Sequence, residues 1–330
     1  MKILIVKTSS LGDIIQSFPA LALLKEAFPQ AEIDWAVEKT YAELLLAHPD
    51  LSRVIPLNLK QWKKSPVKSA SILRQGLKEL RLSRYDLLFD LQGNIKSGLI
   101  TSFAKAKQKI GIAFQAAPEW PSALFLTHRY PLNKTKPITS QYLSLIQNHL
   151  SLSSPFKTKP LILTITPEEN TWIAAQLKPI RKIMICPGSA WENKKLSLSS
   201  WTALMKKLSA EEKTHFYLVW KSEKEKQEGE SLCALFPQNS TLLPSLSLPV
   251  WQNLMGHMDH ICTVDSSALH LAATTSTPTT SFFGPSSSSI YKPPGSHHHA
   301  IQGTCPYGQT FTKRCSRLRT CKTGACIKSL

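Results

Sequence analysis

The 330-residue sequence contains no uninterrupted apolar run of the roughly 18 residues that a membrane-spanning helix requires, which argues against an integral membrane protein. A signal peptide is missing as well, because Asp13 interrupts the first apolar stretch and no small-residue cleavage site follows. The sequence therefore predicts a cytoplasmic protein. Apolar residues make up 42% of the chain and charged residues 19%, a balance that excludes a disordered protein and is typical of a globular one.

Motifs of several common enzyme classes are absent too. The sequence has no G-x-G-x-x-G dinucleotide fingerprint and no Walker A loop. It also lacks the G-x-S-x-G turn of the α/β-hydrolases, which argues against a serine hydrolase. These absences exclude the usual signatures of dinucleotide, ATP and ester chemistry, and the function has to be sought in less common patterns.

Acidic residues are scarce, 22 against 40 lysines and arginines, and the net charge of +18 is unevenly distributed. Residues 1–50 carry a net charge of −3, residues 51–150 of +12, residues 151–300 of +3 and residues 301–330 of +6. Such a field attracts nucleic acid, an anionic membrane surface or a phosphorylated substrate. No RNA- or DNA-binding module is recognisable, so a non-catalytic nucleic-acid-binding protein stands only as the alternative from another class.

Cysteine is absent from the first 185 residues, and four of the seven cysteines lie in the last 26. The three earlier ones lie in apolar surroundings, where a reduced core thiol is expected. The tail, residues 301–330, is basic and has the spacing C-x9-C-x5-C-x4-C without C-x2-C pairs. Reduced thiols, a four-thiolate zinc site and disulfides all remain open for it, and no role is assigned to Cys305, Cys315, Cys321 and Cys326.

Strand-like and helix-like segments alternate, which predicts an α/β fold with parallel sheets. The linker is predicted at the Ser/Pro/Lys-rich residues 151–160. We expect two Rossmann-like domains, 1–155 and 156–300, facing across a cleft with ligands at the carboxyl ends of the strands, and then the tail. Three consecutive histidines at 297–299 are expected in a loop. The predicted strands are 1–7, 31–37, 85–91, 109–113, 181–186, 215–220, 260–264 and 279–283.

The segment KTSSLGDIIQSFPAL, residues 7–21, places an acid behind a strand-to-helix turn. Asp13 has two interpretations. It caps the helix predicted to run to about Phe28, stabilised by the helix dipole. Alternatively, it is a general base at the carboxyl end of the first strand, where a side chain can reach a substrate hydroxyl.

Two further segments of the first half have a chemical and a structural interpretation each. In DLQGNIKSG, residues 90–98, polar groups follow a core strand directly, so they line a ligand cleft or form an ordinary turn. The second segment is a basic stretch that ends in an amphipathic helix predicted over 67–82. It is either a solvated face or an anion-binding lip, and its first lysines are Lys60, Lys63 and Lys64, with Trp62 among them.

In the second half, CPGSAWENKKLS (186–197) follows a predicted strand and contains Lys194. Backbone N–H groups and a lysine in this position suit a diphosphate. In TVDSSALHLAA (263–273), Asp265 ends a strand and two serines open a helix, a pattern that suits a phosphate. The tripeptide GPS at 284–286 ends the next strand, and we expect it to lie beside Asp265.

Together and in this order, these segments resemble the bacterial ADP-heptose:lipopolysaccharide heptosyltransferases, glycosyltransferase family 9. The resemblance covers most of the chain, from Lys2 to about Gly295, and is closest to the heptosyltransferase I type. It is carried by VKTSSLGDIIQSFPAL (6–21), RVIPLNLKQWKK (53–64), YDLLFDLQGNIKSG (85–98) and VDSSALHLAA (264–273).

The resemblance implies the GT-B fold, with the acceptor on the N-terminal domain and the nucleotide sugar on the C-terminal one. It implies that L-glycero-D-manno-heptose passes from ADP-heptose, a substrate, to a Kdo residue of Kdo2-lipid A in lipopolysaccharide inner-core biosynthesis. Inversion at the sugar, no metal or other cofactor and no nucleic-acid partner are expected. The implied location is peripheral, on the anionic cytoplasmic face of the inner membrane.

Position by position, the resemblance makes Asp13 the catalytic base and Lys194 a catalytic residue at the donor diphosphate. The other donor-binding positions that it implies are Ser189, Glu225 for the ribose, Leu246 for the adenine, and Asp265, Ser266, Ser267 and His270 for the heptose and phosphates. The acceptor-binding positions that it implies are Ser10, Gly12, Lys60, Lys63, Lys64, Gln92 and Lys96.

Some positions depart from the family pattern. Pro118 stands where the most similar relatives carry a basic residue, and Pro137 and Gln141 replace an expected His and Arg. The sequence KKLS at 194–197 replaces the more usual K-x-W-P. These changes leave the acceptor open, so a heptosyltransferase II-type or related enzyme with another core acceptor, and a homologue that binds without turnover, are the alternatives.

Overall fold

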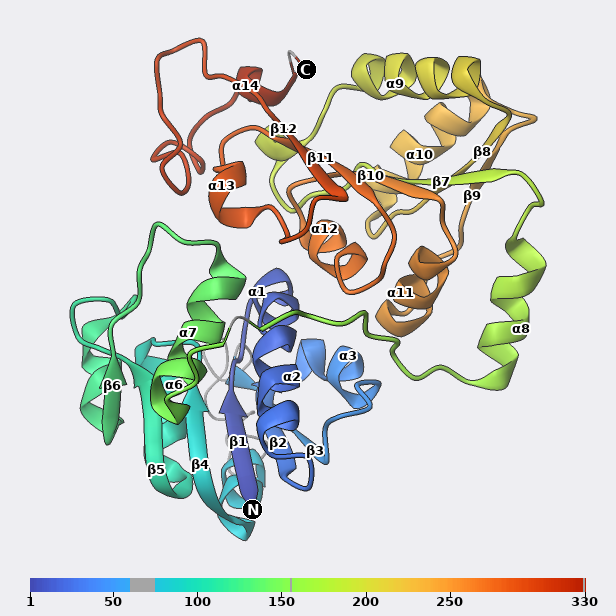
Figure 1. The fold of residues 1–330 in the computed structure, drawn as a ribbon. Helices are drawn as coiled ribbons and strands as arrows, with labels where there is room; N and C mark the ends of the chain where they lie inside the picture. The colour runs from blue at the N-terminus through green and yellow to red at the C-terminus, as the bar shows by residue number, and fades with distance from the viewer. Residues whose placement is uncertain (60–74, 155, 329) are drawn as a thin grey trace. The chain divides into compact units, whose positions relative to one another are not determined.

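A computed structural model of the chain describes residues 1–59, 75–154, 156–328 and 330 (Figure 1). The chain divides into two compact units, Met1–Lys159 and Pro160–Leu330. The border falls at the end of the predicted linker rather than at 155/156, and residues 301–330 belong to the second unit. Each unit contains a six-stranded sheet, and all pairs between neighbouring strands are parallel.

The first unit has the strand order β3-β2-β1-β4-β5-β6. Every strand predicted in this unit is confirmed. Strands β3 and β6 were not predicted, because they are short and lie at the edges of the sheet. Strand β3 also contains Pro56, which an edge strand tolerates. The elements are β1 (Lys2–Val6), α1 (Leu11–Gln16), α2 (Phe18–Ala27), β2 (Glu32–Glu38), η1 (Lys39–Tyr41), α3 (Ala42–Leu46), β3 (Arg53–Leu57), β4 (Arg84–Asp90), α6 (Ile95–Phe103), β5 (Lys105–Ile112), η2 (Trp120–Phe125), β6 (His128–Tyr130) and α7 (Ile138–Leu150), with residues 75–82 also helical.

Strand β1 shows why this sheet forms. Leu4 and Val6 pack with Ile100 of α6 in one core cluster, while Ile3 and Ile5, which point to the opposite face, are also fully buried. A parallel strand that is covered on both faces has a continuous apolar sequence, as KILIV does. The helix predicted up to Phe28 is instead two helices, because Pro19 lacks an N–H group and fits only in the first turn of a new one, α2.

The second unit repeats this topology with the order β12-β11-β10-β7-β8-β9. The predicted strands 181–186, 260–264 and 279–283 have the predicted bounds, as β7, β10 and β11. The elements are α8 (Pro167–Gln176), β7 (Arg181–Cys186), η3 (Glu192–Lys194), α9 (Leu198–Glu211), β8 (Thr214–Leu218), α10 (Glu223–Leu235), β9 (Ser240–Leu242), α11 (Leu248–Gly256), β10 (His260–Val264), α12 (Ser267–Ala272), β11 (Thr279–Phe283), α13 (Ser288–Tyr291), β12 (His298–Gln302) and α14 (Ala325–Lys328).

The loop expected at 297–299 is wrong, because His298 begins β12, which pairs with β11. His298 is buried and its Nδ1 lies 3.0 Å from the hydroxyl of Thr279, while His299 is exposed. Burial lowers the pKa of His298 to about 4, so the ring is neutral at pH 7. Buried His298 and exposed His299 alternate as residues of an edge strand do. Three histidines in a row do not by themselves indicate such a strand.

In both sheets the order in which the chain adds strands reverses at the middle. The reversal lies between β1 and β4 in the first unit and between β7 and β10 in the second. At such a switch point the loops that follow the two central strands separate to opposite faces and leave a crevice at the carboxyl ends, where α/β proteins bind ligands. The registers Val6↔Asp90 and Cys186↔Thr263 bring the ends of these strand pairs together. The segments that begin at Lys7, Leu91, Pro187 and Asp265 therefore start beside the two crevices.

The tail packs on the second unit. Ile327 of α14 is fully buried in the core cluster of β7, β8 and β10, and the N–H of Gly303 donates to the carbonyl of Phe283 at 2.8 Å. All seven cysteines are free thiols, so the disulfide alternative is not realised. Over residues 1–59, 75–154 and 156–328, no group of three or more His, Cys, Asp or Glu side chains is placed to hold a metal ion. No helix among the described residues is long and apolar enough to cross a membrane.

Candidate functional site

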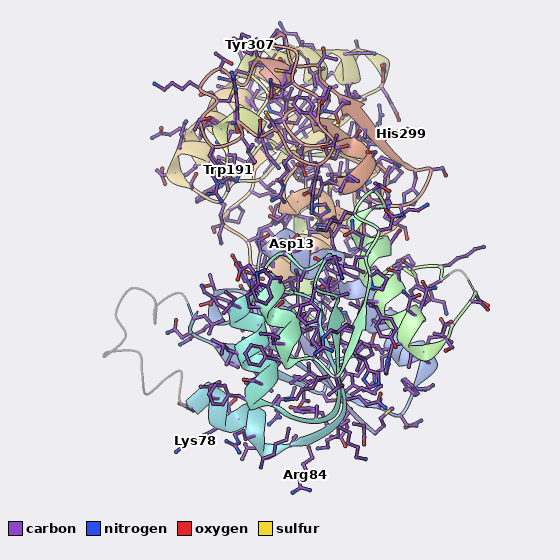
Figure 2. The ribbon with its side chains drawn as sticks, turned by 90° about the vertical axis from the view of Figure 1, so that its left-hand side faces the viewer. Asp13, Lys78, Arg84, Trp191, His299 and Tyr307 are labelled. Atoms are coloured by element: carbon purple, nitrogen blue, oxygen red, sulfur yellow. The ribbon has the colours of Figure 1, made fainter. Side chains whose placement is uncertain are left out.

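Asp13 lies in the first turn of α1, at the end of the first unit to which its strands point (Figure 2). One carboxylate oxygen accepts hydrogen bonds from the N–H of Ser10 at 3.1 Å and from its hydroxyl at 2.6 Å. The Asp13 side chain is partly buried. The helix-capping interpretation is thus realised, and it is compatible with the chemical one, because the cap holds the carboxylate beside the crevice at β1 and β4.

Buried charges lie directly behind Asp13. Lys7 follows β1 and is 3% exposed, with its ammonium 5.0 Å from the centre of the Tyr142 ring. Burial lowers the pKa of Lys7, and the carboxylates of Asp13 and Asp90 oppose that shift. Asp90 at the end of β4 is 1% exposed, and burial raises its pKa, opposed by hydrogen bonds from its own loop and by Lys7.

Gln92 connects the two loops of this crevice. Its side-chain carbonyl accepts hydrogen bonds from the N–H groups of Thr8 and Ser9, each at 3.2 Å. Gly12 is the second residue of α1, and Lys96 is exposed in the first turn of α6. Gln92 thus links the loop before α1 to the loop before α6, and Lys96 lies in the helix turn that follows, whereas Lys60, Lys63 and Lys64 lie outside the described residues.

In the second unit, Lys194 and Asp265 form a buried ion pair at the switch point. The ammonium of Lys194 lies 2.5 Å from a carboxylate oxygen of Asp265, and both side chains are less than a tenth exposed. The hydroxyl of Ser286 donates to the same oxygen, as expected from the GPS segment beside it. Burial alone would raise the pKa of Asp265, but Lys194, His270 and Ser286 together hold that pKa below its ordinary value.

The helix start at 266–267 lies beside this pair. Ser266 is the N-cap of α12, and its hydroxyl accepts a hydrogen bond from the N–H of Ala268 at 3.3 Å. Ser267 is the first residue of the helix, and His270 in the same helix is 7% exposed. The structure thus brings the predicted phosphate-side residues Lys194, Asp265, Ser266 and Ser267 to one end of β7 and β10.

Glu225 lies at the start of α10 and is 8% exposed. One carboxylate oxygen accepts hydrogen bonds from the N–H groups of Lys221 and Ser222, at 2.9 and 3.3 Å, and the other lies 3.9 Å from the ammonium of Lys195. A Cβ atom on Gly188 would lie 2.7 Å from this second oxygen, so a larger residue there would displace the carboxylate. Glu225 is therefore fixed beside the loop that follows β7.

The two remaining donor positions are also near loops of this sheet edge. Ser189 belongs to the loop after β7, and its hydroxyl accepts a hydrogen bond from the N–H of Trp191 at 3.3 Å. Leu246 is partly buried between β9 and α11. The assignment of Ser189 and Leu246 as donor contacts stays a prediction.

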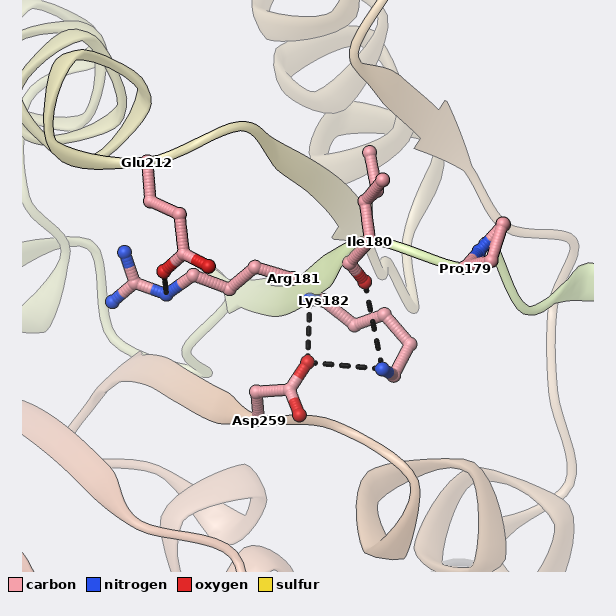
Figure 3. A pocket seen from close by; sticks show the side chains of 6 residues that line it. All are labelled: Pro179, Ile180, Arg181, Lys182, Glu212 and Asp259. Atoms are coloured by element: carbon pink, nitrogen blue, oxygen red, sulfur yellow. Dashed lines mark hydrogen bonds and ion pairs between the residues drawn. The ribbon is translucent and has the colours of Figure 1, made fainter.

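A cavity of about 450 Å³ lies in the second unit at the amino ends of the strands, opposite the ends that carry Lys194 and Asp265 (Figure 3). It surrounds the start of β7, where Lys182 pairs with Asp259 at 3.0 Å and Arg181 with Glu212 at 3.5 Å. The N–H of Lys182 also donates to Asp259 at 2.7 Å. The amino ends of parallel strands are not where α/β proteins bind ligands, and these charges are paired with one another, so we do not assign the site to this cavity.

The family model of glycosyltransferase family 9 (heptosyltransferase) matches residues 73–320, which is well over half of the sequence. The chain belongs to glycosyltransferase family 9. Among curated relatives of this family 9 glycosyltransferase, lipopolysaccharide heptosyltransferase 1 of Pseudomonas aeruginosa is 28% identical over 284 residues, 84% of this chain and 77% of the relative. The protein of the same name from Escherichia coli K12 is 26% identical over 288 residues, 84% of this chain and 86% of the relative.

Solved structures agree on the fold of this family 9 glycosyltransferase. Escherichia coli heptosyltransferase WaaC with ADP matches with a TM-score of 0.80 at 23% identity, over 94% of this chain and 97% of WaaC. The same protein with ADP-2-deoxy-2-fluoro heptose matches with a TM-score of 0.78 at 24% identity, over 92% and 94%. The predicted GT-B class and the predicted family are confirmed.

Three side chains of this family 9 glycosyltransferase were not singled out as site residues from the sequence. Lys7 and Asp90 are the buried charges behind Asp13, and Ser286 is the second partner of Asp265. A lysine or an aspartate at the very end of an otherwise apolar strand is the signal that marks the first two, because a charge buried there needs a partner. Ser286 belongs to the GPS segment after β11, which was expected beside Asp265 without a role for this serine.

Proposed function

We propose that this glycosyltransferase transfers L-glycero-D-manno-heptose from ADP-heptose to a Kdo residue of Kdo2-lipid A in lipopolysaccharide inner-core biosynthesis. The observation that carries the proposal is the buried Lys194–Asp265–Ser286 cluster at the switch point of the second sheet. Relatives named lipopolysaccharide heptosyltransferase 1 and the likeness to WaaC with ADP support the choice of donor and of acceptor class.

At the donor, Lys194 supplies a fixed positive charge for the diphosphate. Asp265, which also accepts a hydrogen bond from Ser286, holds the lysine in place before substrate arrives, so little reorganisation is needed when charge develops. As the bond between the anomeric carbon and the phosphate oxygen breaks, its electron pair stays on the departing ADP, where Lys194 stabilises it. We propose that the reaction uses no metal or other cofactor, because this lysine provides the cation that a leaving diphosphate requires.

At the acceptor, Asp13 acts as the general base. Its carboxylate takes the proton of an acceptor hydroxyl while that oxygen forms the new bond to the anomeric carbon from the face opposite ADP. A single displacement inverts the centre, so one carboxylate is enough for the proton chemistry. Ser10 orients the carboxylate through its hydroxyl and N–H groups.

The acceptor assignment is supported by charge. Residues 51–150 carry a net charge of +12, which suits the carboxylates of Kdo and the phosphates of lipid A. The same field attracts the anionic cytoplasmic face of the inner membrane, where we propose that the enzyme works as a peripheral protein without a nucleic-acid partner. Gln92 lies in the loop before α6 and Lys96 in its first turn, and we propose that these two residues and Lys60, Lys63 and Lys64 bind the acceptor.

The acceptor is tested by presenting two lipids to the enzyme with ADP-heptose in the presence of EDTA. We expect ADP release with Kdo2-lipid A and at least about tenfold slower release with Kdo2-lipid A that already carries its first heptose. The anomeric configuration of the product, read by NMR, should be inverted relative to the donor. Faster release with the heptosylated lipid would assign the heptosyltransferase II-type reaction instead, and loss of release in EDTA would contradict the metal-independent mechanism.

Membrane attachment is tested by sedimentation with vesicles. The enzyme should sediment with vesicles that contain phosphatidylglycerol, remain in the supernatant with phosphatidylcholine alone, and dissociate near 1 M salt, where the Debye length is about 3 Å. Replacing Lys63 and Lys64 by glutamate should weaken binding several-fold. The matched control replaces the exposed Lys206 and Lys207 of the second unit, with the same change in charge. Equal losses in both variants would contradict a specific surface in the first unit.

A further inference from the structure

The tail contacts two loops of the second unit that carry donor-site residues. We call residues 187–195 the Lys194 loop and residues 284–287 the Ser286 loop. The side-chain amide of Asn193, in the Lys194 loop, donates to the carbonyls of Leu318 at 2.6 Å and Cys321 at 3.3 Å. Asn193 is 7% exposed, and these two tail carbonyls are the partners that its amide group reaches inside the protein.

The Ser286 loop is bound by an earlier part of the tail. The N–H of Ser287 donates to the carbonyl of Lys313 at 2.9 Å, and the N–H of Cys315 donates to the carbonyl of Pro285 at 2.6 Å. Ser286 itself forms an antiparallel bridge with Arg314. One continuous segment, residues 313–321, therefore makes backbone-level contacts with both loops.

The tail has its own fixed points, so it can support the loops. Ile327 is fully buried, and a Cβ atom added to Gly284 would lie 2.6 Å from the Cβ of Ile327. Gly324 has a φ of +60°, and a Cβ atom there would lie 2.9 Å from the Cα of Asn193. The last turn of the tail thus sits directly on Asn193, and a side chain larger than that of glycine would separate them.

Through these contacts the tail connects the two loops that contribute Lys194 and Ser286 to the donor cluster. Lys194 follows Asn193 in one loop, Ser286 lies in the other, and both side chains meet at the carboxylate of Asp265. Contacts that restrict both loops before the substrate arrives reduce the conformational freedom that is lost on binding, and that loss would otherwise weaken affinity. A loop held in advance keeps the ammonium at the position where the charge of the leaving group develops.

We propose that residues 313–324 act as a clamp that holds the Lys194 and Ser286 loops in their donor-binding arrangement, with Asn193 as the positioning residue for Lys194. This inference rests on the proposed function, because it assumes that Lys194 binds the diphosphate of ADP-heptose. It gives the Cys-rich tail a role that needs neither a metal nor a disulfide. The chemical class that the clamped site binds is a nucleoside diphosphate sugar.

The test is a double-mutant cycle on the full-length protein, with ADP as the probe and calorimetry as the readout. We expect Asn193→Ala to weaken ADP binding about tenfold and Lys194→Met to weaken it more. The double variant should bind no more weakly than Lys194→Met, within about twofold, because Asn193 acts only through Lys194. The control is Tyr217→Phe, which also removes two hydrogen bonds to backbone groups, at Lys178 and Gln176, and should leave ADP affinity unchanged.

A second route leaves Asn193 in place. Gly324→Ala should displace the tail from the Lys194 loop and weaken ADP binding by a similar factor, and Asn193→Ser serves if Asn193→Ala does not fold. Wild-type affinity in Asn193→Ala or Gly324→Ala, or losses that multiply in the double variant, would overturn the clamp. Failure of the wild type to bind ADP at all is a different result, which would overturn the proposed function together with the clamp.

Discussion

Replacing Asp13 by asparagine is expected to lower kcat for heptose transfer about a thousandfold, the range that a positioned general base contributes. Asparagine has nearly the same shape and still offers a carbonyl oxygen to the N–H and hydroxyl of Ser10, so the start of α1 should be kept. What the variant loses is the ability to accept a proton. Steady-state ADP release measures the loss, and calorimetry should show ADP affinity within about twofold of the wild type.

The matched control is Ser10→Ala. It removes the 2.6 Å hydrogen bond to Asp13 and leaves the carboxylate in place, so the rate should fall far less than in Asp13→Asn. A comparable fall in both variants would mean that the cap, and not the proton transfer, matters. Transfer at the wild-type rate by Asp13→Asn would rule out Asp13 as the base.

Replacing Lys194 by methionine is expected to raise the KM for ADP-heptose and to lower kcat about 10²–10³-fold, since it removes the cation that meets the leaving group. It also leaves the buried carboxylate of Asp265 without its ion partner, which costs about 3–5 kcal/mol of stability when such a pair is broken. Lys194→Arg retains the charge and should recover much of the stability. Initial rates over a range of donor concentrations separate KM from kcat.

The stability loss has a pH signature. In the wild type, partners hold the pKa of Asp265 below its ordinary value, so this group stabilises the fold above the unfolded pKa and loses that effect as the pH falls through the folded pKa. In Lys194→Met burial dominates, which raises the pKa and favours the protonated form in the folded state. Thermal unfolding should therefore show a gap between wild type and variant that widens from about pH 4 to about pH 7. A gap that stays constant over this interval would show that Lys194 does not control the ionisation of Asp265.

Strands with a continuous apolar sequence could be predicted from the sequence alone. Strands β1, β7 and β10 lie in the middle of their sheets, and β11 lies next to β10. Both faces of these strands are covered, and such burial favours a continuous apolar sequence. The short strands β3, β6 and β9 and the histidine-led β12 lie toward the edges, where tertiary pairing and not composition decides the structure.

The predicted site residues that follow central strands were placed correctly with respect to the strand ends. Asp13 and Gln92 lie at one switch point, and Lys194 and Asp265 at the other, because parallel topology brings every such loop to the same edge. The support behind them was not predictable in the same way. Asn193 acts through carbonyls of a tail more than 120 residues away, and such a contact leaves no pattern in the local sequence.

The most direct test of heptose transfer is ADP release from ADP-heptose with and without Kdo2-lipid A, measured for the wild type beside Asp13→Asn. We predict release that depends on the lipid in the wild type and that is lost in the variant, while both proteins bind ADP. Release that does not depend on any lipid acceptor, or no release from a wild type that binds ADP, would contradict heptose transfer to Kdo2-lipid A.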